Sequence, residues 1–452
     1  MPPRCGQAAH VYTQHLRQHS YLYIAGVMDI CIPVTEELVD SFGGSYLLYS
    51  VYLDGFILFK VRYKDLNFWD EQMHRVFGNR LPKFPPKYFL AMTKPMVDKR
   101  RLMLETYLQK IVSDPVVSGS EIFITFFKKL QLDTFKVSTR KLIIGMYLPD
   151  GRQVKVDTQT SDTADRVLEA ALYKLHVSRE LMEYFCLFIT HKASNGDFTV
   201  VKRLAHFEIP FMTIWNIHDD RFQIDIRKRY MNPYTDVMLM GCIAAVDLLY
   251  AQAVQELEMK WCRPTEEQIQ KLQNFIKIDN KVQFLQLMQQ VEHYGHLQLG
   301  PCTTNHPETN TTVTVSVGSH GLYCSFQTPS NQTEMIRLPI SNISCWHVTM
   351  LPQTEKQNRA LEFKLEYMQG HSLKRITLWT EQAFLLSSCL EKILSEQPVT
   401  FMKEELEIQA GKKTLPNTFT RKHKQTAVSN EKESFLCYMK QSDVFEATDF
   451  NL

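Results

Sequence analysis

The run SYLLYSVYL-DG-FILFKVRY, residues 45–63, constrains the fold more than any other feature of the sequence. Two apolar segments flank Asp54-Gly55, and this dipeptide tolerates the positive φ angles that a tight hairpin turn requires. The run therefore predicts a β-hairpin. A helix should follow, because apolar side chains recur at three- and four-residue spacing until a glycine ends the pattern: Leu66, Trp69, Met73, Val76 and Gly78.

Residues 28–135 complete a compact α+β unit around this hairpin. The segment LPKFPPK, residues 81–87, is proline-rich and should be extended rather than helical. Apolar spacing then predicts one helix over residues 104–111 and another over residues 118–130. The sequence therefore predicts a small sheet with three main helices.

The rest of the chain changes character three times, so the predicted fold class is α+β multidomain. Residues 138–215 have the ββαβ order of a ubiquitin-like fold, with Asn195-Gly196 at one turn. Residues 216–297 predict helices, the most apolar from Asp236 to Glu256. Residues 298–397 predict five short strands closed by a helix from Thr380 to Leu394. We call residues 1–27 the leader and residues 398–452 the tail, and we expect both segments to be disordered.

Composition and motifs argue against several classes of protein. The 452 residues carry 51 Lys+Arg and 49 Asp+Glu, so we expect no nucleic-acid partner. The ten cysteines lack the paired spacing of zinc or redox motifs and indicate reduced, cytosolic thiols. The longest apolar run, Val237 to Val246, is too short to span a membrane. The sequence lacks the common hydrolase, phosphate-loop and metalloprotease motifs, so we expect no enzyme, metal or cofactor.

A basic cluster between Lys60 and Arg101 is the strongest functional signal, with 11 Lys+Arg against four acids. Such a run is most often a solvated face. Three of its cations nevertheless fall at a strand end, in the proline-rich loop and on the apolar stripe of a helix: Arg62, Lys87 and Arg100. A cation on that stripe needs an anionic partner. Spacing alone does not decide between Arg100 and Arg101, and the cluster predicts a site for a phosphate-bearing headgroup.

Residues 28–135 resemble a phox-homology (PX) domain. The resemblance rests on Arg62-Tyr63 after the hairpin, on Phe84-Pro85-Pro86-Lys87, and on Arg100-Arg101 before Leu104 and Tyr107. It implies that an arginine binds the 3-phosphate of phosphatidylinositol 3-phosphate, an aromatic packs on the inositol, a loop lysine meets the 1-phosphate and a helix arginine bonds the ring hydroxyls. These roles fall on Arg62, Tyr63, Lys87 and Arg100. Strict strand alternation would separate Arg62 from Tyr63, so both reach the lipid only if the strand ends there.

The order of the remaining segments resembles the PX–FERM sorting nexins. The cues are CIPV, LPDG, HYGHLQL, CWHVT and QAFLLSSCL, and the resemblance begins near Met28. It implies a three-lobed FERM-like module, in which residues 138–215 form the ubiquitin-like lobe, 216–297 the helical lobe and 298–397 a PTB-like lobe. The PTB-like lobe of this family binds Asn-Pro-x-Tyr or Asn-x-x-Tyr signals in receptor tails by adding a strand to a sheet edge.

The resemblance implies that the peptide edge is Ser344–Met350, facing the helix Thr380–Leu394. Trp346 would anchor the peptide, with Val348 on the same face and Phe384 opposite; equally, Trp346 could be a core residue. The implied function is a cytoplasmic adaptor, peripheral on early endosomes, that diverts receptors such as integrins from degradation to recycling. The C-terminal Leu452 resembles the end of family tails that engage recycling machinery.

Two other functions remain open at this point. One is a FERM-type linker between membrane and cytoskeleton that binds phosphatidylinositol 4,5-bisphosphate. The other is a lipid-modifying enzyme, which the motif search disfavours.

Overall fold

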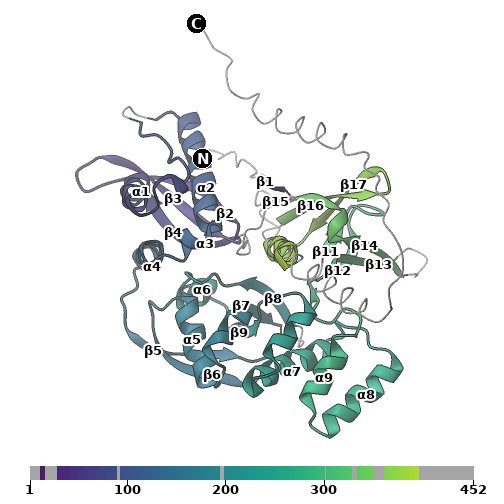
Figure 1. The fold of residues 1–452 in the computed structure, drawn as a ribbon. Helices are drawn as coiled ribbons and strands as arrows, with labels where there is room; N and C mark the ends of the chain where they lie inside the picture. The colour runs from purple at the N-terminus through teal and green to yellow at the C-terminus, as the bar shows by residue number, and fades with distance from the viewer. Residues whose placement is uncertain are drawn as a thin grey trace, which may run out of the picture. The chain divides into compact units, whose positions relative to one another are not determined.

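The structure is a computed structural model that describes residues 11–15, 28–88, 92–193, 198–300, 302–327, 333–350 and 361–396. All of these residues belong to one compact unit, Met1–Val399. The described residues form three β-sheets (Figure 1), and their buried hydrophobic side chains form three clusters that pack against these sheets.

The first sheet contains the predicted hairpin. Its strands follow the order β2 (Ile30–Val39), β3 (Ser45–Leu53) and β4 (Phe56–Arg62), and all pairs are antiparallel. Asp54 and Gly55 have φ angles of 50° and 82° and turn β3 into β4, as the dipeptide predicts.

Four helices and a short 3₁₀ turn accompany this sheet: α1 (Tyr63–Phe77), η1 (Gly78–Arg80), α2 (Lys94–Ser113), α3 (Pro115–Ser118) and α4 (Glu121–Phe135). Gly78 ends α1 with a positive φ, as predicted. Trp69 of α1 stacks on Phe126 of α4, with ring centroids 4.7 Å apart. This contact joins the two helices over the core of the first sheet.

The second sheet has five strands in the order β6-β5-β9-β7-β8, with bounds β5 (Lys141–Tyr147), β6 (Gln153–Gln159), β7 (Phe185–Lys192), β8 (Phe198–Arg203) and β9 (Phe222–Lys228). The ββαβ order is confirmed, with α5 (Ala164–Lys174) as its helix. The connections also contain η2 (Arg179–Tyr184) and α6 (Pro210–Ile217). The Asn195-Gly196 turn lies outside the described residues.

The prediction that residues 216–297 are helical is wrong at its start. Phe222–Lys228 is strand β9, which lies between β5 and β7 and pairs with β5 in parallel. Helices follow as η3 (Pro233–Leu239), α7 (Ile243–Glu258), α8 (Glu266–Lys277) and α9 (Lys281–Met288). The apolar helix expected from Asp236 therefore begins only at Ile243, because the chain first forms a separate 3₁₀ turn.

The third sheet follows the order β1-β15-β16-β17-β11-β12-β13-β14, and β10 pairs with β12. Its strands are β1 (Val11–His15), β10 (Leu297–Gln298), β11 (Cys302–Thr304), β12 (Thr311–Gly318), β13 (Gly321–Gln327), β14 (Thr333–Pro339), β15 (Ile343–Met350), β16 (Leu361–Gln369) and β17 (Ser372–Trp379). A 3₁₀ turn, η4 (Ile340–Asn342), precedes β15, and a helix over residues 383–396 follows β17. The predicted strands and closing helix are present.

The leader, predicted to be disordered, contributes β1 to the third sheet. Val11–His15 pairs antiparallel with β15, so the prediction is wrong for these residues. The other residues of the leader and the whole tail, 398–452, lie outside the described residues.

Candidate functional site

The junction of β4 and α1 places Arg62 and Tyr63 side by side. β4 ends at Arg62, which has extended backbone angles as the N-cap of α1, and Tyr63 is the first helical residue. The predicted lipid site requires the strand to end at this point, because Arg62 and Tyr63 would otherwise point to opposite faces of the sheet. The Arg62 guanidinium lies 3.2 Å from the centroid of the Tyr46 ring, and it makes no ion pair with a carboxylate among the described residues.

Tyr63 joins the three segments that carry the predicted cations. Its hydroxyl donates to the Pro85 carbonyl at 2.8 Å, and its ring lies 5.5 Å from that of Phe84. The Arg100 guanidinium lies 4.2 Å from the Tyr63 ring centroid. The strand end, the proline-rich loop and α2 therefore meet at one aromatic residue.

Arg100 is held between two aromatic rings. Its guanidinium lies 4.2 Å from the centroid of Tyr63 and 4.5 Å from that of Tyr88, and the residue is only 7% exposed. The Arg100 Nε atom is buried without a hydrogen-bond partner in the described part of the chain. Ring contacts stabilise a cation, but a buried guanidinium without a carboxylate is costly unless an anion joins it.

Arg101 is neutralised within the fold, unlike Arg100. Its guanidinium lies 3.8 Å from the Glu105 carboxylate and donates to the Ile32 carbonyl at 3.1 Å. Glu105 also accepts the Ile32 N–H at 2.8 Å, although burial raises the pKa of this carboxyl group. Arg101 therefore fixes α2 to β2, and of the two adjacent arginines only Arg100 faces the aromatic pocket.

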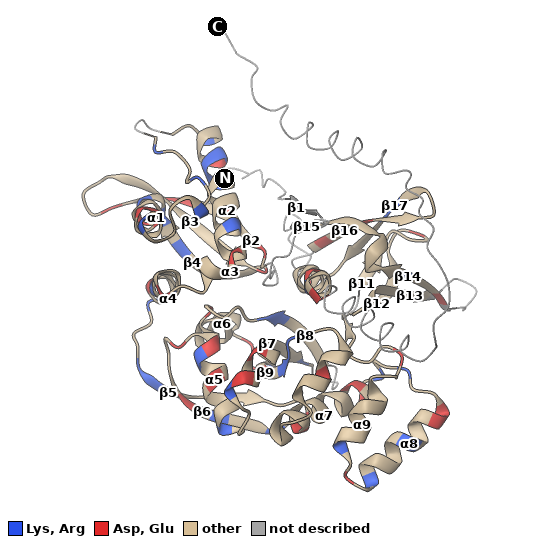
Figure 2. Ribbon diagram, in the orientation of Figure 1, with Lys and Arg blue, Asp and Glu red and all other residues tan. Residues whose placement is uncertain are grey.

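Lys87, the fourth predicted lipid residue, follows Pro85-Pro86 and is exposed. It immediately precedes Tyr88, whose ring covers Arg100. Figure 2 marks Lys and Arg on β4 and along the first turns of α2, the helix that follows this loop in the chain. Lys87 and Arg62 are thus each followed in the chain by a tyrosine whose ring contacts Arg100.

The electrostatics of the pocket keep its hydroxyl groups protonated. Burial raises the pKa of Tyr49 and of Tyr63, and the charge of Arg100 opposes both shifts. Nearby, the pKa of Asp40 is lowered because its carboxylate accepts backbone N–H groups of Gly44 and Phe42, with Arg62 adding to the effect. The neutral hydroxyls of Tyr49 and Tyr63 therefore do not offset the charge of the buried Arg100.

Sequence reasoning missed the two tyrosines that hold the arginines. Tyr46 lies two residues from Leu48, which pairs with Arg62 across β3 and β4, so the hairpin register could have identified it as a diagonal neighbour. Tyr88 directly follows the proline-rich loop, and no local pattern predicts that its ring contacts Arg100, which lies twelve residues later.

The predicted peptide site differs from the structure in one respect. Trp346, Val348 and Phe384 are all buried, Trp346 to 2% exposure, in the core between the sheet and the helix over residues 383–396. The indole N–H of Trp346 donates to the Ser387 hydroxyl at 3.0 Å. The Trp346 side chain is therefore a core residue in this structure and not an exposed anchor, because strand alternation points it inward.

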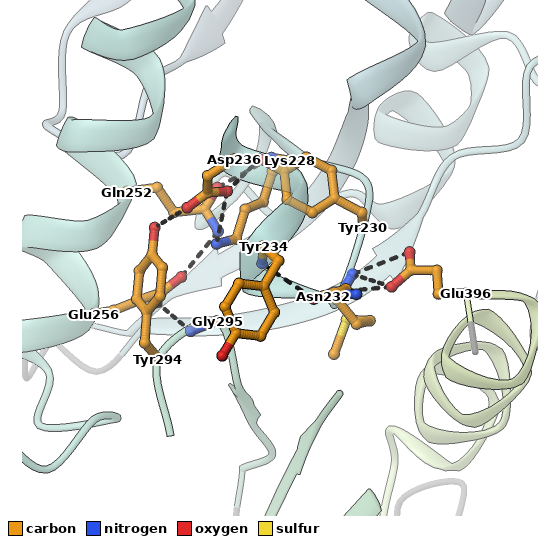
Figure 3. Close-up of polar contacts among 11 residues, drawn as sticks. Lys228, Tyr230, Asn232, Tyr234, Asp236, Gln252, Glu256, Tyr294, Gly295 and Glu396 are labelled. Atoms are coloured by element: carbon orange, nitrogen blue, oxygen red, sulfur yellow. Dashed lines mark hydrogen bonds and ion pairs between the residues drawn. The ribbon is translucent and has the colours of Figure 1, made fainter. Parts of the chain in front are cut away.

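A buried polar network follows β9 (Figure 3). Asp236, which is fully buried, accepts the hydroxyl groups of Tyr230 and Tyr294, the latter at 2.7 Å. The Lys228 ammonium lies 3.9 Å from the Asp236 carboxylate and 4.2 Å from the Tyr294 ring centroid. Hydrogen bonds and a paired cation satisfy this buried carboxylate.

Gln252 and Glu256 of α7 extend this network, and a separate group of contacts reaches the last described helix (Figure 3). Glu256 accepts the Gln252 amide and the Gly295 N–H, both at 3.0 Å. Glu396 accepts the Asn232 N–H at 2.8 Å, so the end of the helix over residues 383–396 is fixed to the segment after β9. The Glu396 contact holds the helix that covers Trp346.

Within the described part of the chain, no helix has the length and apolarity needed to cross a bilayer, and no group of acidic, His and Cys side chains could hold a metal ion.

Three domain families match the chain: the PX domain over residues 57–130, the sorting nexin 17/27/31 FERM domain F1 lobe over residues 143–231, and the Sorting Nexin 17 FERM C-terminal domain over residues 295–398. Sorting nexin-31 of Xenopus tropicalis is 58% identical over 413 residues, which cover 90% of this chain and 96% of that protein. Human Sorting nexin-31 is 44% identical over 390 residues, 84% of this chain and 88% of that protein.

A more distant relative, Sorting nexin-17 of Danio rerio, is 32% identical over 416 residues, 89% of this chain and 88% of that protein. These matches confirm the predicted fold class, a mixed α+β chain with a PX domain followed by FERM-like lobes. The chain belongs to the PX–FERM sorting nexin family.

Proposed function

We propose that this chain is a non-enzymatic endosomal sorting adaptor whose PX domain binds phosphatidylinositol 3-phosphate. The observation that carries the proposal is the position of Arg100, buried between Tyr63 and Tyr88 and without a carboxylate partner among the described residues. In this proposal Arg62 contacts the 3-phosphate, Tyr63 packs on the inositol, Lys87 meets the 1-phosphate and Arg100 bonds the ring hydroxyls. Each charge-assisted hydrogen bond would contribute ~1.5–3 kcal/mol.

The second ligand is an Asn-Pro-x-Tyr or Asn-x-x-Tyr signal in the tail of a transmembrane receptor, integrins among them. An extended peptide would add to the edge of β15 that faces away from β16. Since the Trp346 side chain is buried, we assign the main contact to the β15 backbone and a supporting role to the core formed by Trp346, Val348 and Phe384. The family relationship supports this part of the proposal.

The two ligands would act together at the early endosome membrane. A chain held by the lipid meets receptor tails at a high effective concentration, so each attachment strengthens the other. Captured receptors would then be recycled instead of degraded, with Leu452 as a further contact for recycling machinery.

Liposome flotation of the full chain tests the lipid part. We expect binding to vesicles with phosphatidylinositol 3-phosphate, and Arg62→Ala should weaken it roughly tenfold to a hundredfold while the fold stays intact, since the side chain has no internal ion pair. Arg75→Ala is a matched control, because Arg75 is exposed near the other end of α1.

Preference for phosphatidylinositol 4,5-bisphosphate would favour the membrane–cytoskeleton linker instead. Unchanged flotation of Arg62→Ala would count against the proposed site. Conversion of either lipid to a product would show an enzyme.

A further inference from the structure

The edge of β15 is occupied by the chain's own leader. β1 pairs antiparallel with β15 over five residue pairs, from Val11 with Thr349 to His15 with Cys345 (Figure 1). The opposite edge of β15 pairs with β16 from Ile343 to Met350. β1 therefore lies on the one side of β15 that is open for an added strand.

The composition of β1 fits this position. Val11 and Thr13 are β-branched and Tyr12 is aromatic, residue types that favour strands. An unpaired strand edge presents N–H and C=O groups that attract another extended backbone. Pairing with β1 satisfies these groups without any other protein.

We propose that Val11–His15 is an intramolecular competitor for the peptide edge, which receptor-tail peptides must displace. The inference rests on the proposed function of the β15 edge. Because β1 is covalently attached, its concentration at the edge does not depend on the protein concentration. A chain that begins at Met28 would present the same edge uncovered.

The sequence of the leader makes the competitor displaceable. A receptor signal has Asn and Pro three and two residues before its tyrosine, whereas Ala9 and His10 stand at these places before Tyr12. β1 therefore offers backbone pairing without the Asn-Pro pair of the signal. A peptide with the full signal would therefore displace β1. Its apparent affinity would be lower than its affinity for an uncovered edge, by a factor set by the fraction of chains in which β1 covers the edge.

The size of the effect follows from that fraction. If β1 covers the edge in about nine chains of ten, the apparent Kd of a competing peptide rises about tenfold. Removing residues 1–27 should therefore lower the apparent Kd about tenfold, and so should a double substitution Tyr12→Pro/Thr13→Pro. Neighbouring strand residues direct their N–H groups to opposite sides, so one of the two prolines removes a donor toward β15.

The test measures peptide affinity by titration calorimetry, with an Asn-Pro-x-Tyr peptide and four proteins: the full chain, the chain from Met28, the Tyr12→Pro/Thr13→Pro variant and a Gln18→Pro/His19→Pro control outside β1. We expect tighter binding only by the chain from Met28 and by the Tyr12→Pro/Thr13→Pro variant. Equal affinities for all four, or tighter binding by the control variant alone, would overturn it.

Amide hydrogen exchange without peptide separates this inference from the proposed function. Covering by β1 predicts slow exchange of those N–H groups of residues 345–349 that point toward β1 in the full chain, and faster exchange of the same groups in the chain from Met28. If no protein binds the peptide but this difference is present, the cargo proposal fails and the intramolecular strand stands. If exchange at residues 345–349 is the same in both chains, the intramolecular strand is refuted whatever the peptide does.

Discussion

At the scale of residues, two adjacent arginines have opposite roles. Arg100 lies between aromatic rings, whereas Arg101 reaches Glu105 and the Ile32 carbonyl. Sequence spacing placed both on nearly one stripe of α2 and could not separate them, because the difference depends on β2, which lies about seventy residues earlier in the chain.

The substitution Arg101→Ala should destabilise the fold and spare the proposed lipid site. It leaves the buried Glu105 carboxylate without its cation, and we expect a loss of about 1–3 kcal/mol in the free energy of unfolding. Denaturant unfolding measures the loss, and flotation of the folded protein should retain binding to phosphatidylinositol 3-phosphate. A variant that stays stable but loses the lipid would reverse the two assignments.

At the scale of elements, the predictions that succeeded rest on local signals. Asp54-Gly55 fixes the first hairpin and Gly78 ends α1, because each needs only its own backbone angles. β9 was missed, because FQIDIRK has too few apolar residues to resemble a central strand, yet its last five residues are all buried. The pairing of β1 with β15 joins segments more than three hundred residues apart, which no local pattern predicts.

The helix over residues 383–396 provides a test of the Trp346 assignment. Ser387→Ala would leave the buried indole N–H without the acceptor that lies 3.0 Å away, and we expect a loss of about 1–3 kcal/mol in the free energy of unfolding. Thermal unfolding measures it. Peptide affinity of the folded variant should not change, and a selective loss of affinity would mean that the indole contacts the peptide after all.

The segment before β10 should make stability depend on pH. Burial lowers the pKa of His296 to about 3, with the charge of His293 adding, while its ordinary value is 6.5. The unfolded chain therefore binds more protons below about pH 6.5, and stability falls as pH decreases through that range. His296 alone should lower the free energy of unfolding by about 2 kcal/mol when the pH falls from 7 to 5.

Denaturant unfolding at both pH values checks this loss, with His296→Gln as the comparison because an amide does not titrate. Between the two pH values, the free energy of unfolding of the variant should fall by about 2 kcal/mol less than that of the natural chain. Equal pH dependence of the two proteins would contradict the assignment.

At the scale of the whole molecule, the proposed lipid pocket and the proposed peptide edge belong to different sheets, the first and the third. The chain has a net charge of only +2, but the segment from Lys60 to Arg101 gathers 11 cations and four acids. Glu396 accepts the N–H groups of Met231 and Asn232, so the helix that covers β15 is fixed to a segment more than 160 residues earlier in the chain. The basic cluster and the family resemblance predict the lipid site, and the resemblance alone predicts the peptide site. Only the structure distinguishes Arg100 from Arg101 and places Trp346 in the core.

The central claim is that Arg62, Tyr63, Lys87 and Arg100 form one pocket for a phosphorylated inositol. Titration calorimetry of the full chain with soluble short-chain phosphatidylinositol 3-phosphate tests it most directly, with Arg100→Gln and the exposed control Arg75→Gln measured alongside. We expect the natural chain and the Arg75 variant to bind equally, and Arg100→Gln to bind roughly tenfold to a hundredfold more weakly. Equal binding by all three proteins, or no binding by the natural chain, would contradict the claim.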